Sequence, residues 1–492
     1  MKWIDALEKS KNFWFLIVAS FIFFLLRLPS LFEPYWYGDE GIYQTIGLAL
    51  NNGRNLYTQI WDNKPPLLYL LYSILGSDQF LIRLVSLFFG LFSVIVFLFV
   101  AKRLFSEKVN SQKAVFVSTS VFAFLFSIPL LEGNIANAEN FMLLPILLAS
   151  VFILSHSDKK PKNLYIAGLL ISIAFLFKVV AIFDFATFIV FVFFLQYTNR
   201  AISISNIIKT AKEVIPLIIV FIIPIILVAS YFVIQGSFLD FYQGTFTQMV
   251  SYVAYGNTFL FPQGFLVIKL LLLSLFLFFL FTKRASIPKS SLFILIWLAF
   301  SLFNSFFAER PYTHYLLVLL PSFSLLLGQI IATQKQSFQK AGICLFIVLT
   351  IIIVNNFNLY LKTYPYYKNF ISFLTHQKNV YSYYAFFDSK TPQDYEIAAF
   401  LKMHLKESDN IYIWGNNAQV YKMVNKLPPG RFTVAYHATA RKENSEETKK
   451  AVEKAKPRYI LITSPNSPYP FSLMNYAARI TIGESIIYER LY

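Results

Sequence analysis

Long apolar runs recur along this sequence as far as about residue 361, and they constrain its fold more than any other feature. A run of about 20 apolar residues can cross the hydrocarbon core of a bilayer as a helix. Only 14% of the 492 residues are charged and 57% are hydrophobic, which is too apolar for the surface of a soluble protein. We therefore predict a polytopic, mainly α-helical membrane protein with about eleven transmembrane helices. The windows are 12–32, 78–101, 114–131, 138–156, 164–179, 181–198, 214–234, 264–282, 291–308, 314–333 and 341–361.

Basic residues cluster in alternate loops between these windows, and this alternation predicts the orientation of the chain. Positive charge concentrates on the cytoplasmic side, so we expect a cytoplasmic N-terminus in the cytoplasmic membrane. The loops 33–77, 132–139, 235–264 and 309–314 and the C-terminal region then lie outside. Topology accounts for the net charge of +17, so no nucleic-acid partner is expected. The basic clusters are Lys2, Lys9 and Lys11; Lys102, Arg103, Lys108 and Lys113; Lys159, Lys160 and Lys162; Arg200, Lys209 and Lys212; Lys283, Arg284 and Lys289; and Lys335 and Lys340.

The composition changes after about Tyr360, where the apolar windows stop. Apolar residues at helical spacing predict a helix over 393–405, and the charged stretch 444–456 predicts another. Short apolar runs predict strands at 411–414, 432–436, 459–463 and 486–491. Alternating strands and helices indicate a small α/β domain with some parallel pairing. We therefore divide the chain into a membrane domain, 1–362, with a first outer loop at 33–77, and an extracytoplasmic α/β domain, 363–492.

Two adjacent carboxylates, Asp39 and Glu40, follow the first apolar window. Carboxylates at the edge of a bilayer are costly unless they are solvated, paired or used. Such a position suits a general base or a metal ligand. A solvated loop charge, or the first turn of a short interfacial helix, explains the pair equally well.

Cations accompany this acidic pair on the predicted outer side. Lys64 precedes two prolines, which fix the backbone near the membrane surface, so this lysine could bind a phosphate or simply extend its charge into water. Arg83, Lys178 and Arg310 are further cations close to ends of apolar windows. Each one taken singly suits a structural role, whereas together they indicate an anion site.

A second outer loop carries Glu132, Asn137 and Glu139, which suit either a polar cavity or helix capping by Asn137. His314 is one of five histidines, and no His-Glu-x-x-His pattern accompanies it. The single cysteine, Cys344, excludes an internal disulfide and a cysteine-based zinc site. No metal or cofactor is therefore indicated, and a divalent cation stays an open alternative.

Several of these motifs together resemble membrane glycosyltransferases of the GT-C type. The resemblance rests on Arg27-Leu-Pro, Tyr37-Gly-Asp-Glu-Gly-Ile-Tyr43, Lys64-Pro-Pro-Leu-Leu-Tyr69 and Arg83-Leu-Val-Ser86 with Gly90. Asn137-Ala-Glu-Asn140, Phe177-Lys178 and Arg310-Pro-Tyr-Thr-His-Tyr315 followed by Pro321 are similar to later blocks of the family. The relatives most similar in these motifs are the bacterial relatives of dolichyl-phosphate-mannose protein mannosyltransferases and of the lipid A aminoarabinose transferase.

The resemblance implies transfer of a hexose or pentose from a polyprenyl-phosphate donor to an acceptor on the outer face, with inversion. In that reading Asp39 is the catalytic base, and Glu40 and Glu139 orient it or its ligands. The donor phosphate would be held by Lys64, Arg83 and Arg310, with Lys178 and His314. Contacts to the acceptor or sugar would come from Tyr43, Asn63, Asn137 and Tyr315.

The acceptor and two other classes of function stay open at this point. The chain lacks the large lumenal insert of protein mannosyltransferases, so a glycan, a lipid or a protein could be the acceptor. A transporter or flippase of lipid-linked sugars would also need outward cations, but no paired, broken apolar segments suggest inverted repeats. A non-catalytic envelope assembly protein would rely on the C-terminal domain instead.

Overall fold

The structure is a computed structural model of the whole chain, and it describes residues 11–156, 162–197, 203–247, 265–308, 310–463 and 469–491. Its contacts divide the chain into two compact units. The helical unit comprises 1–28, 85–231 and 246–363. The loop–sheet unit comprises 29–84, 232–245 and 364–492, so the first loop groups with the C-terminal region rather than with the helices.

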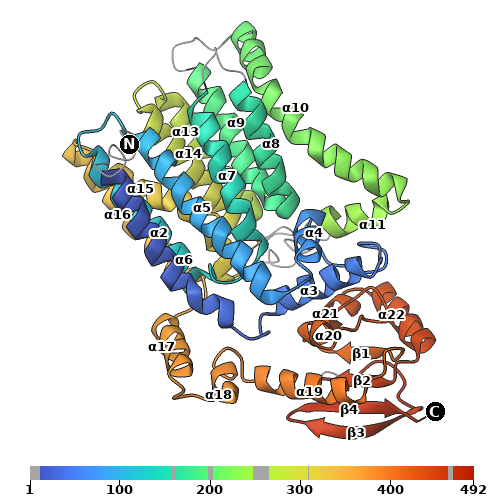
Figure 1. Cartoon of the computed structure of the whole chain (residues 1–492). Helices are drawn as coiled ribbons and strands as arrows, with labels where there is room; N and C mark the ends of the chain where they lie inside the picture. The colour runs from blue at the N-terminus through green and yellow to red at the C-terminus, as the bar shows by residue number, and fades with distance from the viewer. Residues whose placement is uncertain are drawn as a thin grey trace, which may run out of the picture. The chain divides into compact units, whose positions relative to one another are not determined.

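The helical unit is a bundle of long apolar helices (Figure 1). Most are hydrophobic on every side, which is typical of helices that lie in a bilayer or are surrounded by other helices. The pairs α7 with α8, α6 with α15 and α9 with α14 pack along one another. The helices are α2 (Lys11–Arg27), α5 (Gln79–Phe105, whose first residues belong to the other unit), α6 (Ser111–Ser127), α7 (Ala138–Leu154), α8 (Lys162–Phe177), α9 (Ile182–Gln196), α10 (Ile204–Ile234), α13 (Leu266–Lys283), α14 (Lys289–Ser305), α15 (Leu320–Ala332) and α16 (Gln336–Asn356).

Each of the eleven predicted windows overlaps one of these helices, but the number of membrane crossings is not confirmed. Among the described residues, six helical stretches are long and apolar enough to cross a membrane: Lys11–Phe32, Gln79–Phe105, Val179–Gln196, Ile204–Ile234, Leu266–Lys283 and Gln336–Asn356. The shorter apolar helices α7, α8, α14 and α15 have 10–17 residues. Several candidate spans in one chain indicate a multi-pass membrane protein.

The loop–sheet unit combines the first loop with the C-terminal region. The first loop forms α3 (Gly38–Asn51) and α4 (Pro66–Ile74), and residues 232–245 add α11 (Phe238–Tyr242). Pro65 and Pro66 stand at the start of α4, where a missing backbone N–H costs nothing. The C-terminal helices are α17 (Thr363–Leu374), α18 (Val380–Tyr384), α19 (Thr391–His404), α20 (Gln419–Met423), α21 (Ala435–Ala438) and α22 (Lys442–Ala455).

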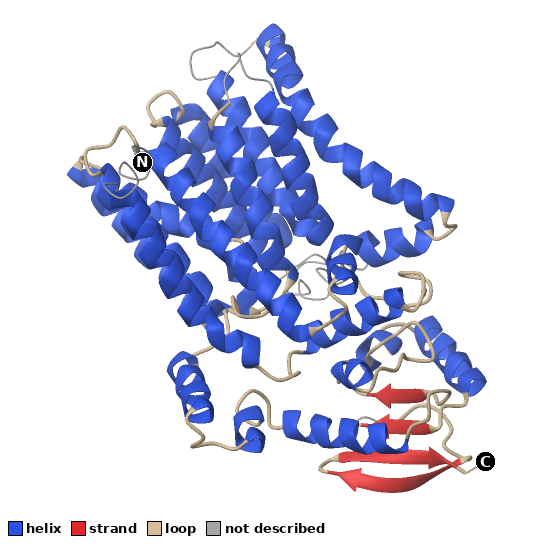
Figure 2. Ribbon diagram, in the orientation of Figure 1, coloured by secondary structure: helices blue, strands red, loops and turns tan. Residues whose placement is uncertain are grey.

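A four-stranded sheet in the order β1-β2-β4-β3 forms the C-terminal core (Figure 2). The strands are β1 (Ile411–Trp414), β2 (Tyr459–Ile462), β3 (Tyr476–Ile482) and β4 (Ser485–Arg490). β1 and β2 pair in parallel, whereas β4 is antiparallel to both of its neighbours. Residues of α19 and α20, among them Leu401 and Val420, pack on Ile413, Leu461 and Ile487 of the sheet to form this core.

Most of the predicted elements in this region are confirmed, with two differences. The prediction of a strand at 432–436 was wrong, because Phe432 makes only an isolated bridge to Trp61 and the chain then forms α21. The edge strand β3 was missed, since its Tyr-Ala-Ala-Arg-Ile-Thr-Ile sequence is mostly exposed and carries no strong apolar alternation.

Candidate active site

The acidic pair of the first loop begins a helix. Asp39 and Glu40 both lie in the first turn of α3, where the helix dipole stabilises negative charge. The two side chains differ in burial, because Glu40 is buried while Asp39 is partly exposed. The helix is positioned by the segment before α20: the Thr45 hydroxyl donates to the carbonyl of Ala418 at 2.9 Å. A Cβ atom at Gly41 would lie 2.8 Å from the backbone nitrogen of Gln419, so only glycine lets α3 pack this closely against that segment.

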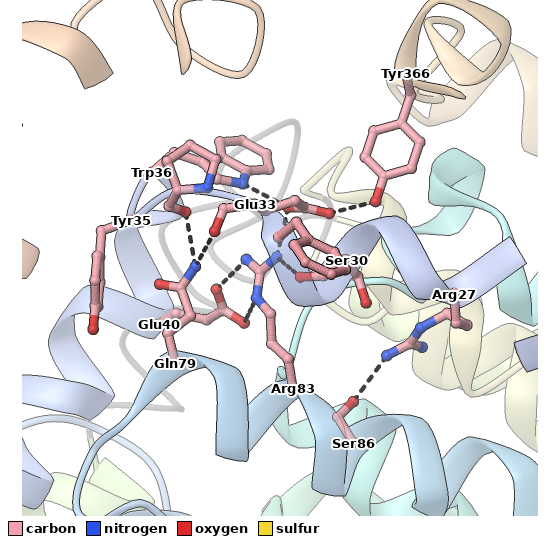
Figure 3. A network of polar contacts seen from close by, with 12 residues as sticks. Arg27, Ser30, Glu33, Tyr35, Trp36, Glu40, Gln79, Arg83, Ser86 and Tyr366 are labelled. Atoms are coloured by element: carbon pink, nitrogen blue, oxygen red, sulfur yellow. Dashed lines mark hydrogen bonds and ion pairs between the residues drawn. The ribbon is translucent and has the colours of Figure 1, made fainter. Parts of the chain in front are cut away.

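Glu40 belongs to a buried ion-pair network centred on Arg83 (Figure 3). The Arg83 Nε and Nη2 atoms donate to the two oxygens of Glu40 at 3.2 and 2.5 Å. Its Nη1 atom lies 2.7 Å from Glu33 and donates to the Ser30 carbonyl at 2.9 Å. Glu33 also accepts from the Tyr366 hydroxyl at 2.6 Å and from the Trp36 indole at 2.7 Å. Arg83 is therefore neutralised by two carboxylates.

Figure 3 also shows Arg27, which belongs to the helical unit and has a different set of partners. Its guanidinium donates to the Ser86 hydroxyl at 3.2 Å and to the Gly133 carbonyl. These bonds tie α2 to α5 and to the loop before α7.

Four of the predicted site residues, Asp39, Tyr43, Asn63 and Lys64, lie close together in the structure. The Tyr43 hydroxyl donates to Asp39 at 3.3 Å. The Lys64 ammonium lies 5.5 Å from the centre of the Tyr43 ring and donates to Asn63 Oδ1 at 2.9 Å. The Lys64 side chain is 17% exposed to solvent. A partly exposed carboxylate and a partly exposed ammonium thus flank one tyrosine.

A second carboxylate, Asp62, lies beside Lys64. It is almost fully buried, accepts from the Tyr69 hydroxyl at 2.7 Å and is 3.8 Å from the Lys64 ammonium. His437 of α21 faces its other oxygen at 3.7 Å. Burial alone would raise the pKa of Asp62, but Lys64, His437 and the Tyr69 hydroxyl together lower it, so this carboxylate stays ionised.

The remaining predicted site residues lie in the helical unit, where four of them form a polar cluster. Lys178 donates to Glu139 in a buried ion pair and lies 4.9 Å from the centre of the Tyr315 ring. His314 Nδ1 is 2.8 Å from Glu132, and its Nε2 is 3.9 Å from Glu139. Lys178 and His314 thus each face a carboxylate.

The other two predicted residues of this unit lie at its loops. Asn137 is the N-cap residue of α7, although its side chain makes no capping hydrogen bond. Arg310 lies three residues before the short 3-10 helix Thr313–Leu317 and is partly buried. In the described part of the chain, no group of three or more histidine, cysteine, aspartate or glutamate side chains could hold a metal ion.

Two families match parts of the sequence. Residues 64–235 match the family described as dolichyl-phosphate-mannose-protein mannosyltransferase. Residues 393–473 match the family described as the C-terminal domain of the competence-induced protein Ccs4. No curated protein matches the sequence.

Two crystal structures of ArnT from Cupriavidus metallidurans resemble the chain over nearly its whole length. The structure bound to undecaprenyl phosphate has a TM-score of 0.56 at 15% identity, and the apo structure has 0.58 at 16% identity. Each comparison covers 97% of this chain and 98% of ArnT. The chain has the GT-C fold. This fold confirms the resemblance that the sequence motifs indicated.

A third structure, the archaeal oligosaccharyltransferase AglB from Archaeoglobus fulgidus with an inhibitory peptide and a dolichol-phosphate, is more distant. Its TM-score is 0.47 at 12% identity, over 92% of this chain and 70% of AglB, which is too low to establish a common fold.

Four residues of this GT-C chain that bear on the candidate site were missed in the sequence. Glu33 and Asp62 stand in the first loop as single acidic residues next to Pro34 and Trp61, and no spacing links them to Arg83 or Lys64. Tyr366 and His437 lie far along the chain in the C-terminal region. The sequence could indicate only that Glu33 and Asp62 need partners, since an acidic side chain at a membrane edge is costly without one.

Proposed function

We propose that the chain is an inverting glycosyltransferase that transfers a sugar from a polyprenyl-phosphate donor to an acceptor on the outer face of the cytoplasmic membrane. Support comes from the matched mannosyltransferase family and from the fold shared with ArnT, which has been crystallised with undecaprenyl phosphate. The observation that carries the proposal is the convergence of Asp39 and Lys64 on Tyr43.

Asp39 is the proposed general base. Inverting transfer requires one carboxylate to take the proton of the acceptor hydroxyl while the opposite face of the sugar loses its phosphate. Glu40 is a poor candidate because both of its oxygens are bonded to Arg83. Asp39 is partly exposed and accepts a 3.3 Å hydrogen bond from Tyr43, so it can receive a proton from a ligand.

Lys64 is the proposed contact to the donor phosphate. Its ammonium is partly exposed and held by Asn63, and charge-assisted hydrogen bonds to phosphate are strong. A cation at that point stabilises the negative charge that develops on the leaving phosphate. Arg83 then acts on the site through Glu40, which it fixes at the start of α3, rather than by direct phosphate binding.

For the helical unit we propose a separate role in binding polar parts of the ligands. Lys178 and His314 each face a carboxylate, so an anionic ligand would have to exchange with Glu139 or Glu132. Arg310, Asn137 and Tyr315 are proposed as further ligand contacts on the grounds of the motifs that contain them.

The test is a reaction of purified protein with polyprenyl-phosphate sugars and a panel of glycan, lipid and protein acceptors, in which sugar transferred to an acceptor and released polyprenyl phosphate are both measured. We expect the two products in equal amounts from the wild-type protein, and both formed about a hundred- to ten-thousand-fold more slowly by Asp39→Asn. Movement of intact donor across vesicles without release of lipid phosphate would instead identify a transporter. No change in either product with Asp39→Asn would refute Asp39 as the base.

A further inference from the structure

A titratable cluster beside Lys64 has no part in the proposed transfer reaction. It consists of Asp62 and Tyr69 from the first loop and His437 from α21, and all three belong to the loop–sheet unit. Asp62 lies at its centre: the Tyr69 hydroxyl and the Lys64 ammonium face one of its oxygens, and His437 Nε2 faces the other.

The segment that carries His437 is fixed against the first loop by several contacts. The Trp61 amide donates to the Arg431 carbonyl at 2.9 Å, and Trp61 pairs with Phe432 in an isolated bridge. Arg431 in turn forms ion pairs with Asp240 at 3.0 Å and Glu447 at 2.9 Å. These contacts define the position of α21 relative to Asp62.

The His437 ring is held between aromatic side chains. It lies edge-on to Trp61, with the ring centres 5.0 Å apart, and against Tyr436 at 4.3 Å. The His437 side chain is only 9% exposed to solvent. The backbone carbonyl is fixed as well, since it accepts from Asn444 at 2.9 Å. The imidazole thus has little freedom to turn away from Asp62.

One ring nitrogen of this histidine lacks a hydrogen bond. Nδ1 is buried and has no hydrogen-bond partner among the described residues. Burial lowers the pKa of His437 to about 4, although Asp62 alone would raise it, so the ring is neutral near pH 7. A neutral imidazole carries one N–H and one acceptor nitrogen. Nε2 lies 3.7 Å from the ionised Asp62, which favours the N–H on Nε2, so we assign Nδ1 as the acceptor.

A buried acceptor without a donor is costly, so the site favours a bound group that supplies one. A second observation indicates the chemistry of that group. Lys64 faces the same Asp62 as His437, and its partly exposed ammonium can bind a phosphate. A hydroxyl next to a phosphate supplies a donor for Nδ1 and an anion for Lys64.

We propose that His437 binds a hydroxyl group of the donor sugar through Nδ1, and that Asp62 is the positioning residue that orients both His437 and Lys64. This inference rests on the proposed function, because it takes a lipid-phosphate sugar as the ligand. It makes the C-terminal region a direct contributor to sugar recognition.

The test compares the binding of two ligands to the full-length protein in detergent, without turnover. One is undecaprenyl phosphate without a sugar, and the other is undecaprenyl phosphate that carries each of a panel of hexoses and pentoses. We expect the wild-type protein to bind at least one sugar-bearing lipid more tightly than the bare lipid. His437→Ala should weaken that binding by about 3- to 10-fold, the range of one neutral hydrogen bond, and leave the bare lipid unaffected.

Two further variants separate a sugar contact from a merely structural one. His437→Asn keeps an acceptor near the Nδ1 position and should restore part of the affinity, whereas His437→Gln places its polar group near Nε2 and should not. The matched control is His404→Ala in α19, whose ring bonds the Phe400 carbonyl of its own helix, and it should alter neither affinity.

Three results would overturn the proposal. They are unchanged binding of the sugar-bearing lipid in His437→Ala, an equal loss for both lipids in His437→Ala, and no preference of the wild-type protein for any sugar-bearing lipid. Because binding is measured without transfer, a protein that prefers the sugar-bearing lipid but never transfers the sugar would refute the proposed function alone.

Discussion

The Arg83 guanidinium donates two hydrogen bonds to the Glu40 carboxylate, at 3.2 and 2.5 Å, and both side chains are buried. The same guanidinium also pairs with Glu33 at 2.7 Å. Removing one partner from a buried ion pair is strongly destabilising, since it leaves an uncompensated charge. The network therefore stabilises the start of α3, from which Asp39 projects.

The first prediction is that Arg83→Met destabilises the loop–sheet unit by about 3–5 kcal/mol, because two buried carboxylates lose their cation. Thermal unfolding in detergent measures the loss. Arg83→Lys should recover only part of it, since an ammonium cannot make the paired bonds of a guanidinium. Arg54→Met is the control: Arg54 bonds the neutral Pro428 carbonyl at 2.8 Å, so the loss there should be about 1 kcal/mol. Equal losses for both variants would contradict the network's role.

The second prediction separates the two adjacent acids. Asp39→Asn should lower turnover by about a hundred- to ten-thousand-fold, the usual range for a general base, with little change in melting temperature. Glu40→Gln should act mainly through stability, because Glu40 is bound to Arg83. The measurement is turnover together with melting temperature for each variant. The base is wrongly assigned if Glu40→Gln abolishes turnover in a stable protein while Asp39→Asn is active.

Local signals in the sequence were enough to predict the helices and the first-loop residues of the candidate site. Apolar runs at 12–32 and 78–101 predict α2 and α5 because a membrane helix needs only its own residues to be apolar. Asp39 and Lys64 stood out because charged side chains are costly beside a membrane.

Contacts between distant segments could not be read from one sequence. Nothing near Arg83 indicates that Glu33 and Glu40 both bind it, and the sequence alone favoured a phosphate contact for this arginine. His437 directly follows the segment 432–436, which we expected to be a strand. In the structure Phe432 makes only an isolated bridge to Trp61, and that bridge depends on how the chain folds back. Pairing of this kind is fixed by tertiary packing, which local pattern does not report.

The third prediction concerns Lys64. Lys64→Met keeps most of the apolar side chain and removes the charge, so it should raise the KM for the lipid donor by roughly 10- to 100-fold, the range of a charge-assisted hydrogen bond. Steady-state kinetics at varied donor concentration provide the measurement. Lys422→Met is the matched control, because Lys422 bonds the Gly76 carbonyl at an exposed position. Unchanged donor KM in Lys64→Met would remove this residue from the phosphate site.

The fourth prediction concerns orientation. The basic loops predict that Lys160, which lies outside the described residues, is cytoplasmic and that Lys402 of α19 is on the outer side. Reporter fusions at these two positions should therefore give opposite signals. Signals from the same side would refute the predicted topology and, with it, an extracytoplasmic reaction.

The fifth prediction is a pH dependence of stability that comes from Asp394 of α19. This carboxylate is buried and accepts hydrogen bonds from Asn417 at 2.7 and 2.9 Å and from Gln419 at 2.8 Å. Burial raises its pKa to about 6, although the two amides lower it in part. Since the folded state holds this proton more tightly than the unfolded state, stability falls as the pH rises from about 4 through 6. The total change is at most about 3 kcal/mol.

Asp394→Asn removes this titration. The melting temperature of the variant, minus that of the wild-type protein, should therefore rise between pH 4.5 and 7, roughly the window in which Asp394 titrates, and stay level above it. The control is Asp409→Asn. Slight burial would raise the pKa of Asp409, but its hydrogen bond to Arg458 at 2.8 Å lowers it, so that carboxylate is already ionised throughout the window. The difference in melting temperature between Asp409→Asn and the wild-type protein should therefore be constant across this pH range. A constant difference for Asp394→Asn as well would show that Asp394 does not hold its proton in the folded state.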